Sequence, residues 1–448
     1  MKDSQPRRFG LIGHPLGHSL SPWIHIRIMD AAGIRGDYQL YDLGPEEFEA
    51  ELPKLLPSLD GFNCTIPYKQ KIIPYLREIA PSAQIYGAVN TVYQGKGYNT
   101  DGVGFASCKV PLAGKSLCLL GAGGVARVLA IEAARAGARS IVIKARNLGQ
   151  AHKLAEMVCA QGFKEISVQE DECDPPCDVI LNGTPLGMWP NAGALPLEDR
   201  HLCGATAVFD TIYNPTATRL VLKAKSRGVW ANGGLQMLFE QALAAQKIWN
   251  PGVDFARVQA DLNKIQQTLA REVLRHSPLK LVLTGFMGSG KTHIGSLLAE
   301  RMQGLLPFVD LDEVIAARVQ KTIPDIFAID GEAHFRHLER ECLREILSAP
   351  GSLVLATGGG AVVQAGMAEL IHELGALIVY LDVPLPVALN RIGTDPSRPL
   401  LQGGTGAIET LYHSRRPIYE AAGDLIVSGE NNPQWIVEEI VQAFGWID

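Results

Sequence analysis

The sequence predicts an α/β protein with more than one domain, and three observations carry that prediction. Its length of 448 residues exceeds what one hydrophobic core ordinarily organises. Short apolar runs alternate with helical patterns along the chain, as in folds built on parallel sheets. Two glycine-rich phosphate loops of different chemical type, at 121–126 and 285–292, suit a dinucleotide and a nucleoside triphosphate respectively. We therefore expect two active sites on one polypeptide.

Strands are expected at the short apolar runs, many of which end in glycine or polar residues. In the first half these runs are 9–13, 38–42, 61–65, 116–120, 140–143, 179–181 and 207–210. In the second half they are 279–284, 308–310, 353–356, 377–381 and 425–427. Between the two series, residues 253–274 carry apolar side chains at helical spacing, which predicts a helix. The segment 275–278 ends that helix, because proline disfavours helix in the residue before it.

Composition and charge favour a globular protein that acts on small molecules. Apolar residues make up 47% of the chain and charged residues 20%, which is ordinary for a globular domain. The net charge of −6 gives no sign of a nucleic-acid or membrane partner, so local arginines and lysines must hold any anionic substrate. The first residues lack the apolar segment of a signal peptide, and no apolar stretch is long enough to span a membrane. We expect a cytoplasmic location.

The cysteines agree with that location. The chain has eight, without the regular spacing of a disulfide framework, which predicts reduced thiols. Cys173 and Cys177 are spaced like half of a metal site, but no second Cys/His pair matches them. A polar surface loop is the favoured interpretation there.

The first phosphate loop has the dinucleotide form and follows an apolar run. It comprises Gly121, Ala122, Gly123, Gly124, Val125 and Ala126. The glycines permit a tight turn and close approach of a pyrophosphate, and the small Ala126 lets the following helix pack closely on the strand. Lys144 and Arg146 stand where an NAD-binding fold would offer an acid to the ribose, so NADP is favoured. Solvated surface charges are the alternative for these two cations.

The segment 13–22 is too unusual for a generic loop. Ser21 before Pro22 suits the N-cap of a helix over 22–32, which leaves Ser19 without an explanation. His14, His18 and His25 suggest a metal site, but no carboxylate stands at a fitting spacing.

Polar strings also follow several apolar runs, where open α/β sheets bind small molecules. These strings are 63–69, 88–91, 99–102, 182–188, 210–215 and 234–241. Together with the segment 13–22, they resemble shikimate dehydrogenase from about residue 8 to 270. The resemblance implies NADP-linked reduction of the ketone of 3-dehydroshikimate to shikimate.

The resemblance also implies roles for individual residues. Lys69 would stabilise and protonate the oxygen that gains charge, and Asp101 would hold Lys69 and a ring hydroxyl. A surface ion pair is the alternative for these two residues. Substrate hydrogen bonds or pocket contacts are implied for Ser19, Ser21, Thr65, Asn90, Tyr213 and Gln241, and cofactor contacts for Gly234 and Met237.

The chain departs from the family pattern at Cys64, Gly183 and Ala145. The first two changes are expected to affect packing only. Ala145 replaces the asparagine of a cofactor clamp, which leaves an NAD-linked quinate/shikimate dehydrogenase as an alternative.

The second phosphate loop, Gly285–Thr292, has the full G-x-x-x-x-G-K-T pattern and precedes a helix over 293–302. In such loops backbone N–H groups hold phosphates, the lysine reaches the β and γ oxygens, and the hydroxyl ligates Mg²⁺. The residues expected around ATP and magnesium are Gly288, Ser289, Gly290, Lys291, Thr292 and His293.

Five further strings in the second half identify an acceptor. They are 310–312, 335–339, 358–360, 398–401 and 415–419, and with the phosphate loop they resemble shikimate kinase over nearly all of 279–445. The resemblance implies that Asp312 orients and deprotonates the attacking hydroxyl while Asp310 supports the Mg²⁺ shell. The residues implied to surround the substrate ring and carboxylate are Arg336, Glu339, Gly358, Gly359, Gly360 and Arg415.

Two further arginines are implied to act on the nucleotide. Arg398 would belong to a lid over 392–406 that brings positive charge to the transferring phosphoryl group. Arg391 would lie against adenine, opposite a loop near Pro433.

The prediction is therefore a fused enzyme: a two-domain dehydrogenase with a Rossmann-type NADP domain, followed by a P-loop kinase domain resembling nucleoside monophosphate kinases. The substrate domain is placed at 1–105 plus 235–272, the NADP domain at 106–234, a linker at 273–278 and the kinase at 279–448. Its partners would be 3-dehydroshikimate and shikimate, in a possible homo-oligomer. A binding protein with a degenerate enzyme fold is the alternative from another class, and direct transfer of shikimate between the sites is a further hypothesis.

Overall fold

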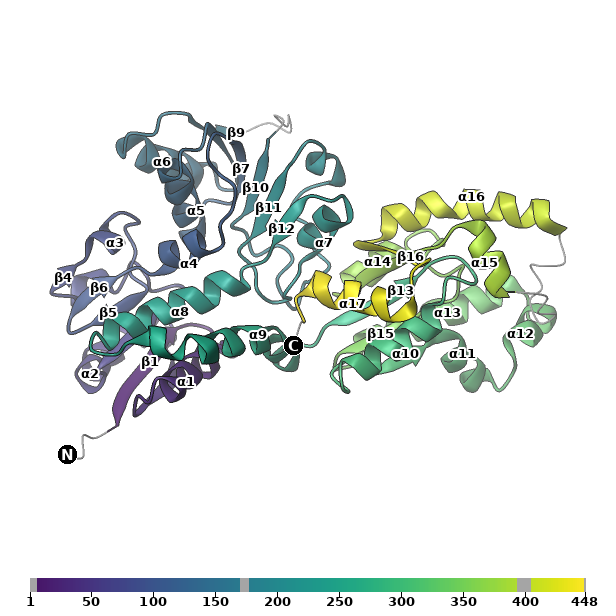
Figure 1. The fold of residues 1–448 in the computed structure, drawn as a ribbon, viewed down its shortest axis with the longest axis horizontal. Helices are drawn as coiled ribbons and strands as arrows, with labels where there is room; N and C mark the ends of the chain where they lie inside the picture. Colours follow the sequence, from purple (N-terminus) through teal and green to yellow (C-terminus); the bar gives the residue numbers. More distant parts are fainter. Residues whose placement is uncertain (1–5, 170–176, 393–403, 447–448) are drawn as a thin grey trace.

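The protein consists of three sheets, each covered by helices, arranged along an elongated molecule (Figure 1). The computed structural model describes residues 6–169, 177–392 and 404–446. In two of the sheets every recorded strand pair is parallel, and the first sheet is mixed. The α/β fold class predicted from the alternation of apolar runs and helices is confirmed.

The first sheet has the order β2-β1-β3-β5-β6-β4. Its strands are β1 (Arg7–Gly13), β2 (Gly36–Asp42), β3 (Gly61–Cys64), β4 (Glu78–Ile79), β5 (Thr91–Tyr93) and β6 (Lys96–Tyr98). The helices of this part are α1 (Ser21–Ala31), α2 (Phe48–Leu55), α3 (Pro81–Gln84), α4 (Asp101–Ser107), α8 (Leu235–Trp249) and α9 (Gln259–His276). The chain thus leaves this sheet after α4 and returns to it at α8.

The second sheet has the order β12-β11-β10-β7-β8-β9, and all its recorded pairs are parallel. Its strands are β7 (Ser116–Leu120), β8 (Ser140–Lys144), β9 (Ile166–Gln169), β10 (Val179–Asn182), β11 (Ala207–Asp210) and β12 (Trp230–Asn232). Its helices are α5 (Gly124–Arg135), α6 (Leu148–Ala160) and α7 (Arg219–Ser226). The strand order reverses between β7 and β10, which is where doubly wound sheets bind nucleotides.

The third sheet has the order β14-β15-β13-β16-β17, again parallel. Its strands are β13 (Lys280–Thr284), β14 (Phe308–Asp310), β15 (Leu353–Ala356), β16 (Leu377–Asp382) and β17 (Leu425–Ser428). Its helices are α10 (Lys291–Arg301), α11 (Leu311–Val319), α12 (Ile323–Ile329), α13 (Glu332–Ser348), α14 (Met367–Glu373), α15 (Leu385–Ile392), α16 (Gly404–Ala422) and α17 (Pro433–Phe444).

The structure corrects three expectations about helix ends. Ser21 is the first residue of α1 and does not cap it, because Leu20 occupies the N-cap without a side-chain hydrogen bond. The helix expected over 253–274 begins at Gln259, after a 3₁₀ turn at Phe255–Val258. It runs on to His276, so residues 273–276 of the expected linker are helical and only Ser277–Leu279 separate α9 from β13.

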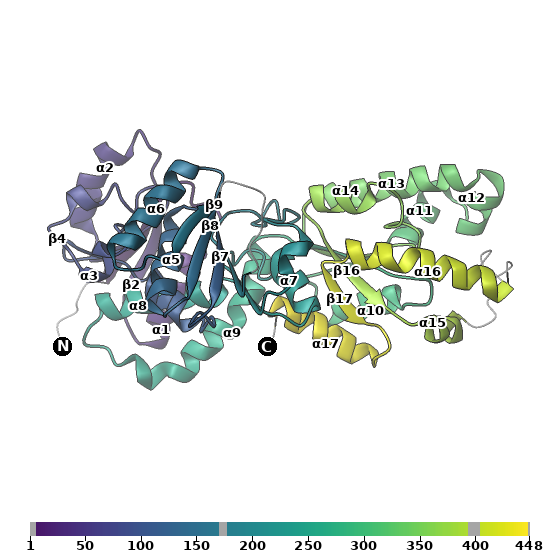
Figure 2. The same cartoon turned by 90° about the horizontal axis from the view of Figure 1, so that it is seen from above.

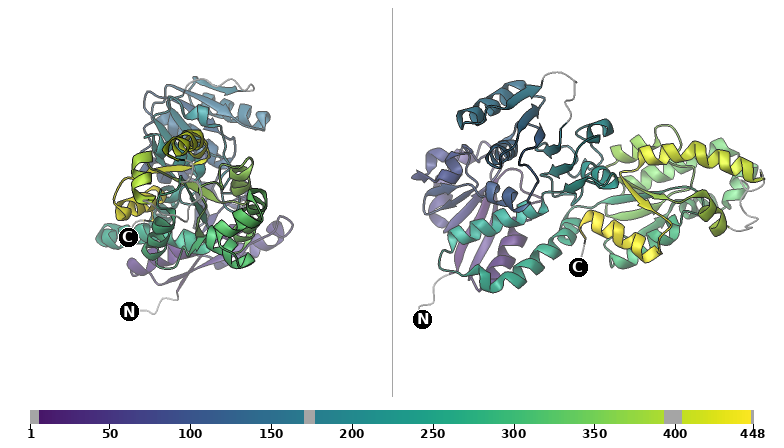
Figure 3. Two further views of the ribbon diagram at one scale, coloured as in Figure 1. Left: turned by 90° about the vertical axis from the view of Figure 1, so that its right-hand side faces the viewer. Right: turned by 45° about the horizontal axis from the view of Figure 1, so that its top comes forward.

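The second and third sheets share a hydrophobic core. One cluster of buried residues extends from Leu120 and Ile180 through α7 and the end of α9 to Leu281 and Ile440. The views in Figures 2 and 3 place α7 and α17 at this junction. A continuous core of this kind favours a fixed arrangement of the two parts.

No helix in the described ranges combines the length and apolar character that a membrane-spanning segment needs.

Candidate active sites

The first site centres on an ion pair between Lys69 and Asp101. Lys69 Nζ lies 2.6 Å from Asp101 Oδ2, and the two side chains are 24% and 12% exposed. Asn90 Nδ2 donates to Asp101 Oδ1 at 2.8 Å, so both carboxylate oxygens accept a hydrogen bond. Asp101 also begins α4, where the helix N-terminus favours negative charge. The pair is therefore partly buried and positioned by the protein alone.

A buried polar network fixes Asn90. Its Nδ2 also donates to Thr100 Oγ1 at 3.0 Å, and its Oδ1 accepts from Thr100 N at 2.8 Å and from Thr91 Oγ1 at 2.9 Å. Asn63 lies beneath it, donating to Asn90 O at 3.1 Å and accepting from Tyr38 Oη at 2.8 Å. Because each amide end is engaged, the orientation of Asn90 toward Asp101 is determined.

The strand ends bring Thr65 beside the segment 13–22. Thr65 follows β3, its N–H donates to Ile12 O at 2.9 Å, and a Cβ added at Gly13 would lie 2.4 Å from its methyl carbon. Ser19 lies on the loop that joins β1 to α1, and Ser21 is the first residue of α1, with its backbone N donating to Ser19 Oγ at 3.3 Å. Parallel strands β1 and β3 therefore present these hydroxyls at one edge of the sheet.

Helix α8 carries Gln241 to the same region. A Cβ on Gly104 of α4 would lie 2.5 Å from Met237 O, so α8 packs directly on the helix that opens with Asp101. Tyr213 follows β11 of the second sheet and packs against a cluster that includes Leu20 and Ile24. Burial raises the pKa of the Tyr213 hydroxyl.

The three histidines that suggested a metal face different partners. His14 Nδ1 lies 2.7 Å from Asp42 Oδ1, and the His18 ring meets Trp189 edge-on with centroids 4.6 Å apart. His25 is buried and stacked on Tyr38 at 4.2 Å, and burial lowers its pKa to about 3. Within the described residues, no group of three or more His, Cys, Asp or Glu side chains could hold a metal ion.

The dinucleotide loop leaves room for a pyrophosphate. Gly121 has a φ of 98°, and a Cβ there would lie 3.1 Å from Gly183 O. Helix α5 begins at Gly124, and a Cβ on Gly123 or Gly124 would meet nothing within 4 Å. The first N–H groups of a helix have no partner within it, so the open space beside these glycines fits an anion bound at this helix start.

The cations expected at the ribose lie at the end of β8. Lys144 is the last residue of that strand, and Arg146 is exposed two residues later. Asn147 caps α6, accepting from Gln150 N at 3.0 Å. At Gly234, a Cβ would lie 2.1 Å from Thr211 O, so this glycine permits a close backbone contact before α8. Met237 is buried in the core of the second sheet.

Asp210 is a fully buried carboxylate to which the sequence motifs assign no role. Asp210 accepts from Asn182 Nδ2 at 3.0 Å, Thr218 Oγ1 at 2.7 Å and Ile212 N at 3.0 Å. Burial nevertheless raises its pKa to about 6. This carboxylate joins β10, β11 and α7.

The second site begins at the phosphate loop between β13 and α10. Gly288 and Gly290 have φ values of 78° and 92°, conformations that other residues rarely adopt. Lys291 Nζ lies across the loop, donating to Gly285 O at 2.9 Å and Phe286 O at 3.1 Å. Ser289 is buried, whereas His293 in the first turn of α10 is exposed.

The residues expected at Mg²⁺ are in contact. Thr292 Oγ1 donates to Asp310 Oδ2 at 2.8 Å, and Asp312 N–H donates to Asp310 Oδ1 at 3.0 Å. A hydroxyl and a carboxylate at the mouth of a phosphate loop are the hard oxygen ligands that Mg²⁺ prefers. The residues present therefore fit the ion.

A cluster of polar side chains faces the triple glycine. Arg336 Nη1 donates to Glu339 Oε2 at 2.7 Å, while Glu339 Oε1 is buried with no partner among the described residues. A Cβ on Gly358 would lie 3.1 Å from Glu339 Oε1 and from Asp312 Oδ1, and one on Gly360 would lie 2.5 Å from Arg336 Nη2. Burial raises the pKa of Glu339 although Arg336 acts in the opposite direction. The cluster offers a carboxylate acceptor and a cation to a ligand.

Helix α16 carries Arg415 to the same cluster. Its Nη1 lies 3.4 Å from Gly359 O, and the Tyr419 hydroxyl donates to the same carbonyl. Arg391 of α15 donates to Gly429 O at 2.7 Å, next to the loop that precedes Pro433 and α17. Arg398, most of the expected lid and Cys173 lie outside the described residues.

Two contacting residues have no motif that points to them. Gln364 Nε2 donates to Glu339 Oε2 at 2.6 Å, and Trp189 meets His18. Gln364 follows the string 358–360, and Trp189 follows the string 182–188. Proximity to these strings is the sequence signal that could have identified them.

Two family models match the chain. The model described as the shikimate dehydrogenase substrate binding domain matches residues 11–92. The model described as shikimate kinase matches residues 287–444.

Curated relatives match the first part. A shikimate dehydrogenase (NADP(+)) of Caldanaerobacter subterraneus subsp. tengcongensis is 38% identical over 260 residues, which span 55% of this chain and 92% of the relative. The shikimate dehydrogenase (NADP(+)) of Bacillus subtilis is 34% identical over 253 residues, 54% of this chain and 90% of the relative.

Solved structures give the same result. A chorismate mutase/shikimate 5-dehydrogenase fusion protein from Clostridium acetobutylicum matches with a TM-score of 0.52 and 32% identity, covering 60% of this chain and 99% of the other. The shikimate 5-dehydrogenase from Thermus thermophilus, in complex with NADP(H) and shikimate, matches with a TM-score of 0.51 and 30% identity, covering 58% and 99%.

Proposed function

Because the chain belongs to the shikimate dehydrogenase family and carries a shikimate kinase domain, we propose one bifunctional enzyme with consecutive reactions. The first site reduces 3-dehydroshikimate to shikimate with NADPH, and the second phosphorylates the 3-hydroxyl of shikimate with MgATP. The single observation that carries this proposal is that an assembled Lys69–Asp101 site and a phosphate loop occur in one chain, with Thr292 of that loop and Asp312 both donating to Asp310. The product of one site is the substrate of the other.

At the first site, Lys69 stabilises the oxygen of the reacting ketone. The Gly121–Ala126 loop would hold NADPH, which would supply a hydride for the carbonyl carbon. The Lys69 ammonium lies beside Asp101, and it donates its proton to the oxygen as negative charge develops there. Asp101 keeps Lys69 in place and accepts a hydrogen bond from a ring hydroxyl.

Around this pair, the remaining polar residues bind the substrate. Ser19, Ser21 and Thr65 hold the carboxylate and hydroxyls from one sheet edge, and Gln241 does so from α8. Asn90 acts through Asp101, because its two amide hydrogens go to Thr100 and Asp101 and so hold the Asp101 carboxylate in position.

At the second site, Asp312 acts on the attacking hydroxyl. Thr292 and Asp310 would hold the Mg²⁺ of MgATP, which would supply the phosphoryl group. Asp312 accepts the proton of the attacking hydroxyl, and the buried Oε1 of Glu339 accepts a hydrogen bond from a second ring hydroxyl. Arg336 and Arg415 hold the carboxylate through charge-assisted hydrogen bonds.

The test is product identification in one reaction. The purified chain is incubated with 3-dehydroshikimate, NADPH and MgATP, and products are identified by mass spectrometry. The proposal predicts shikimate 3-phosphate, with shikimate alone when ATP is omitted. Formation of neither product would refute it, and faster turnover of quinate with NAD than of shikimate with NADP would favour the alternative dehydrogenase.

A further inference from the structure

The loop after β10 joins three parts of the molecule at Trp189. This residue follows the string 182–188, and its N–H donates to Asn214 O at 2.9 Å. The Trp189 ring also makes a T-shaped contact with the His18 ring, and the two ring centroids lie 4.6 Å apart. His18 is next to Ser19 on the loop of the first sheet, so the contact crosses from the NADP-binding sheet to the substrate loop.

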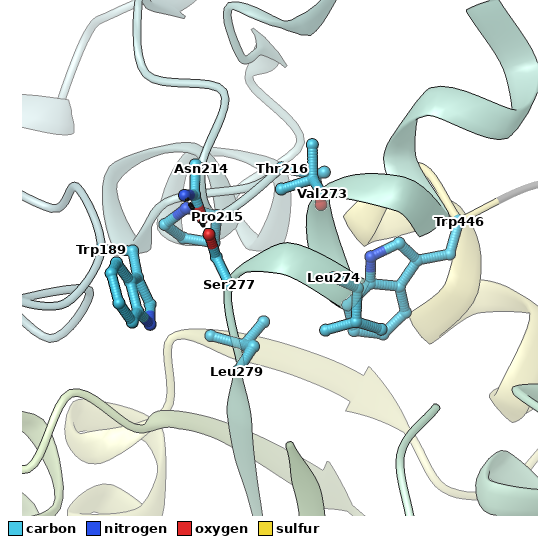
Figure 4. Close-up of a pocket in the computed structure, with 9 residues that line it drawn as sticks. All are labelled: Trp189, Asn214, Pro215, Thr216, Val273, Leu274, Ser277, Leu279 and Trp446. Atoms are coloured by element: carbon cyan, nitrogen blue, oxygen red, sulfur yellow. Dashed lines mark hydrogen bonds between the residues drawn. The ribbon is translucent and has the colours of Figure 1, made fainter. Parts of the chain in front are cut away.

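The kinase domain lies on another side of Trp189. Trp189, Leu274, Leu279 and Trp446 line one small pocket, which brings together the second sheet, α9 and both ends of the kinase domain. In Figure 4, Trp189 and Trp446 flank the hydrogen bond from Asn214 Nδ2 to Ser277 Oγ, which measures 2.6 Å.

The loop that continues from Trp189 packs on kinase backbone without spare room. A Cβ on Gly193 would lie 1.8 Å from His372 O, and a Cβ on Gly375 would lie 2.6 Å from Pro190 O. Arg219 Nη1 closes the contact by donating to Gly193 O at 2.6 Å. The position of the loop therefore depends on α14 of the kinase domain.

Helix α7 fixes the kinase domain against the same sheet. Arg219 Nε donates to the fully buried Asp424 at 2.7 Å, and Lys223 Nζ donates to Gly423 O at 3.2 Å. Ser226 Oγ accepts from Ile426 N at 2.9 Å, which satisfies an edge amide of β17. Lys225 Nζ donates to Ala443 O at 2.6 Å at the end of α17. Four polar side chains of this one helix thus form hydrogen bonds to the kinase domain.

We propose that Trp189 is a positioning residue of the dehydrogenase and that the kinase domain holds it there. The kinase domain holds the loop 190–193 in place, and Trp189 holds His18. His18 in turn positions the substrate loop that carries Ser19 and leads into α1 at Ser21. The kinase domain is then part of the scaffold of the first active site as well as a second catalyst. This proposal rests on the dehydrogenase activity proposed above.

The expected consequence is confined to substrate binding. Trp189 touches neither Lys69 nor Asp101 in any recorded contact, so its loss should weaken the hold on shikimate and spare the chemical step. An edge-to-face aromatic contact of this kind corresponds to about a 2- to 10-fold change in affinity.

The experiment uses the full chain and steady-state oxidation of shikimate by NADP⁺. Trp189→Ala should raise KM for shikimate by about 2- to 10-fold with kcat within about twofold, and Trp189→Phe should restore most of the loss. Gly193→Ala, which inserts a methyl group between the loop and His372, should raise the same KM although it lies outside the substrate loop. The matched control is Gly252→Ala, where an added Cβ meets nothing within 4 Å.

Kinase rates and thermal melting of each variant separate positioning from misfolding. The proposal expects kinase KM and kcat for Trp189→Ala to stay at the wild-type values. An unchanged dehydrogenase KM in Trp189→Ala would overturn the role of Trp189, and an unchanged KM in Gly193→Ala would overturn the role of the kinase domain. An equal fall of both activities would also overturn it, because that result is general destabilisation. If the wild-type chain did not oxidise shikimate, that result would instead refute the proposed function.

Discussion

The two candidate active sites differ in how far the protein completes them by itself. At the first site, both oxygens of Asp101 accept hydrogen bonds from Lys69 and Asn90. At the second site, Glu339 Oε1 is buried without a partner among the described residues, and Lys291 lies on carbonyls of its own loop. Unmet buried acceptors are costly, so a polar ligand that donates to Glu339 is expected to stabilise the second site more than the first. The difference teaches that one site is positioned in advance and the other is completed by its ligands.

The largest effects should separate the two sites completely. Lys69→Ala should lower dehydrogenase kcat by about 10²–10⁴-fold and leave phosphorylation of added shikimate unchanged, because it removes the proposed proton donor. Asp312→Ala should do the reverse. Steady-state rates of both reactions on each variant are the measurement.

Lys71→Ala is the matched control for the first variant, since Lys71 is exposed two residues from Lys69. If either substitution lowered both activities alike, the two sites would not be separate catalysts.

The next effect concerns a carboxylate that is fully hydrogen-bonded yet costly to ionise. Asp210 has a folded-state pKa of about 6 against 3.8 for an ordinary aspartate. Between those pH values the folded chain binds a proton that the unfolded chain has lost. The free energy of unfolding therefore falls as pH rises from about 4 to 6, and above about 6 the contribution of this proton is gone. The fall amounts to roughly 3 kcal/mol at most.

Denaturant titrations measure the free energy of unfolding of wild type and Asp210→Asn. Suitable conditions are about pH 4.5, within that window, and about pH 7, above it. The wild type should lose stability relative to the variant on going to the higher pH. A constant difference would mean that Asp210 ionises normally and that its three donors outweigh burial.

Crowding at the second site gives a smaller effect. Gly360→Ala would place a Cβ 2.5 Å from Arg336 Nη2 and displace the guanidinium from the ring site. Because hydrogen bonds to charged groups contribute about 1.5–3 kcal/mol, KM for shikimate in the kinase reaction should rise by about tenfold or more. Dehydrogenase parameters serve as the internal reference.

Gly252→Ala again controls for the methyl group itself, as an added Cβ there meets nothing within 4 Å. An unchanged KM in Gly360→Ala would remove Arg336 from the substrate site.

The smallest effect concerns the choice of cofactor. Arg146 is exposed after β8, and a solvated contact with the 2′-phosphate contributes up to about 1 kcal/mol. Arg146→Ala should therefore raise KM for NADP⁺ by about fivefold and leave KM for NAD⁺ unchanged. Arg257→Ala, at a side chain that is 84% exposed, is the control. Equal changes for both cofactors would assign Arg146 to the solvated surface.

The strands that follow strong apolar runs were predictable, and the short ones were not. The runs at 116–120 and 377–381 correspond to β7 and β16, because parallel strands buried on both faces consist of nearly continuous apolar residues. The strands β4, β9 and β12 were missed because two to four residues carry too little periodicity. The hairpin of β5 and β6 did have a sequence signal, which is the glycine at 95 in the turn between the two strands. In the structure Gln94 and Gly95 both have positive φ and form a two-residue turn.

Contacts between distant segments were beyond the sequence. Motif strings pointed to Lys69 and Asp101, which the structure brings to 2.6 Å. Nothing local, however, shows that Arg219 of α7 meets Asp424 of the kinase domain, or that Gly193 packs against His372. Ser21 shows the opposite error, because a residue with good capping chemistry became the first helical residue instead.

A structure of the chain determined at saturating shikimate tests the central claim most directly. The account predicts the ligand in both clefts: one molecule beside Lys69 and Asp101, and one whose carboxylate meets Arg336 while a hydroxyl reaches Asp312. Shikimate in only one cleft, or in neither, would contradict it.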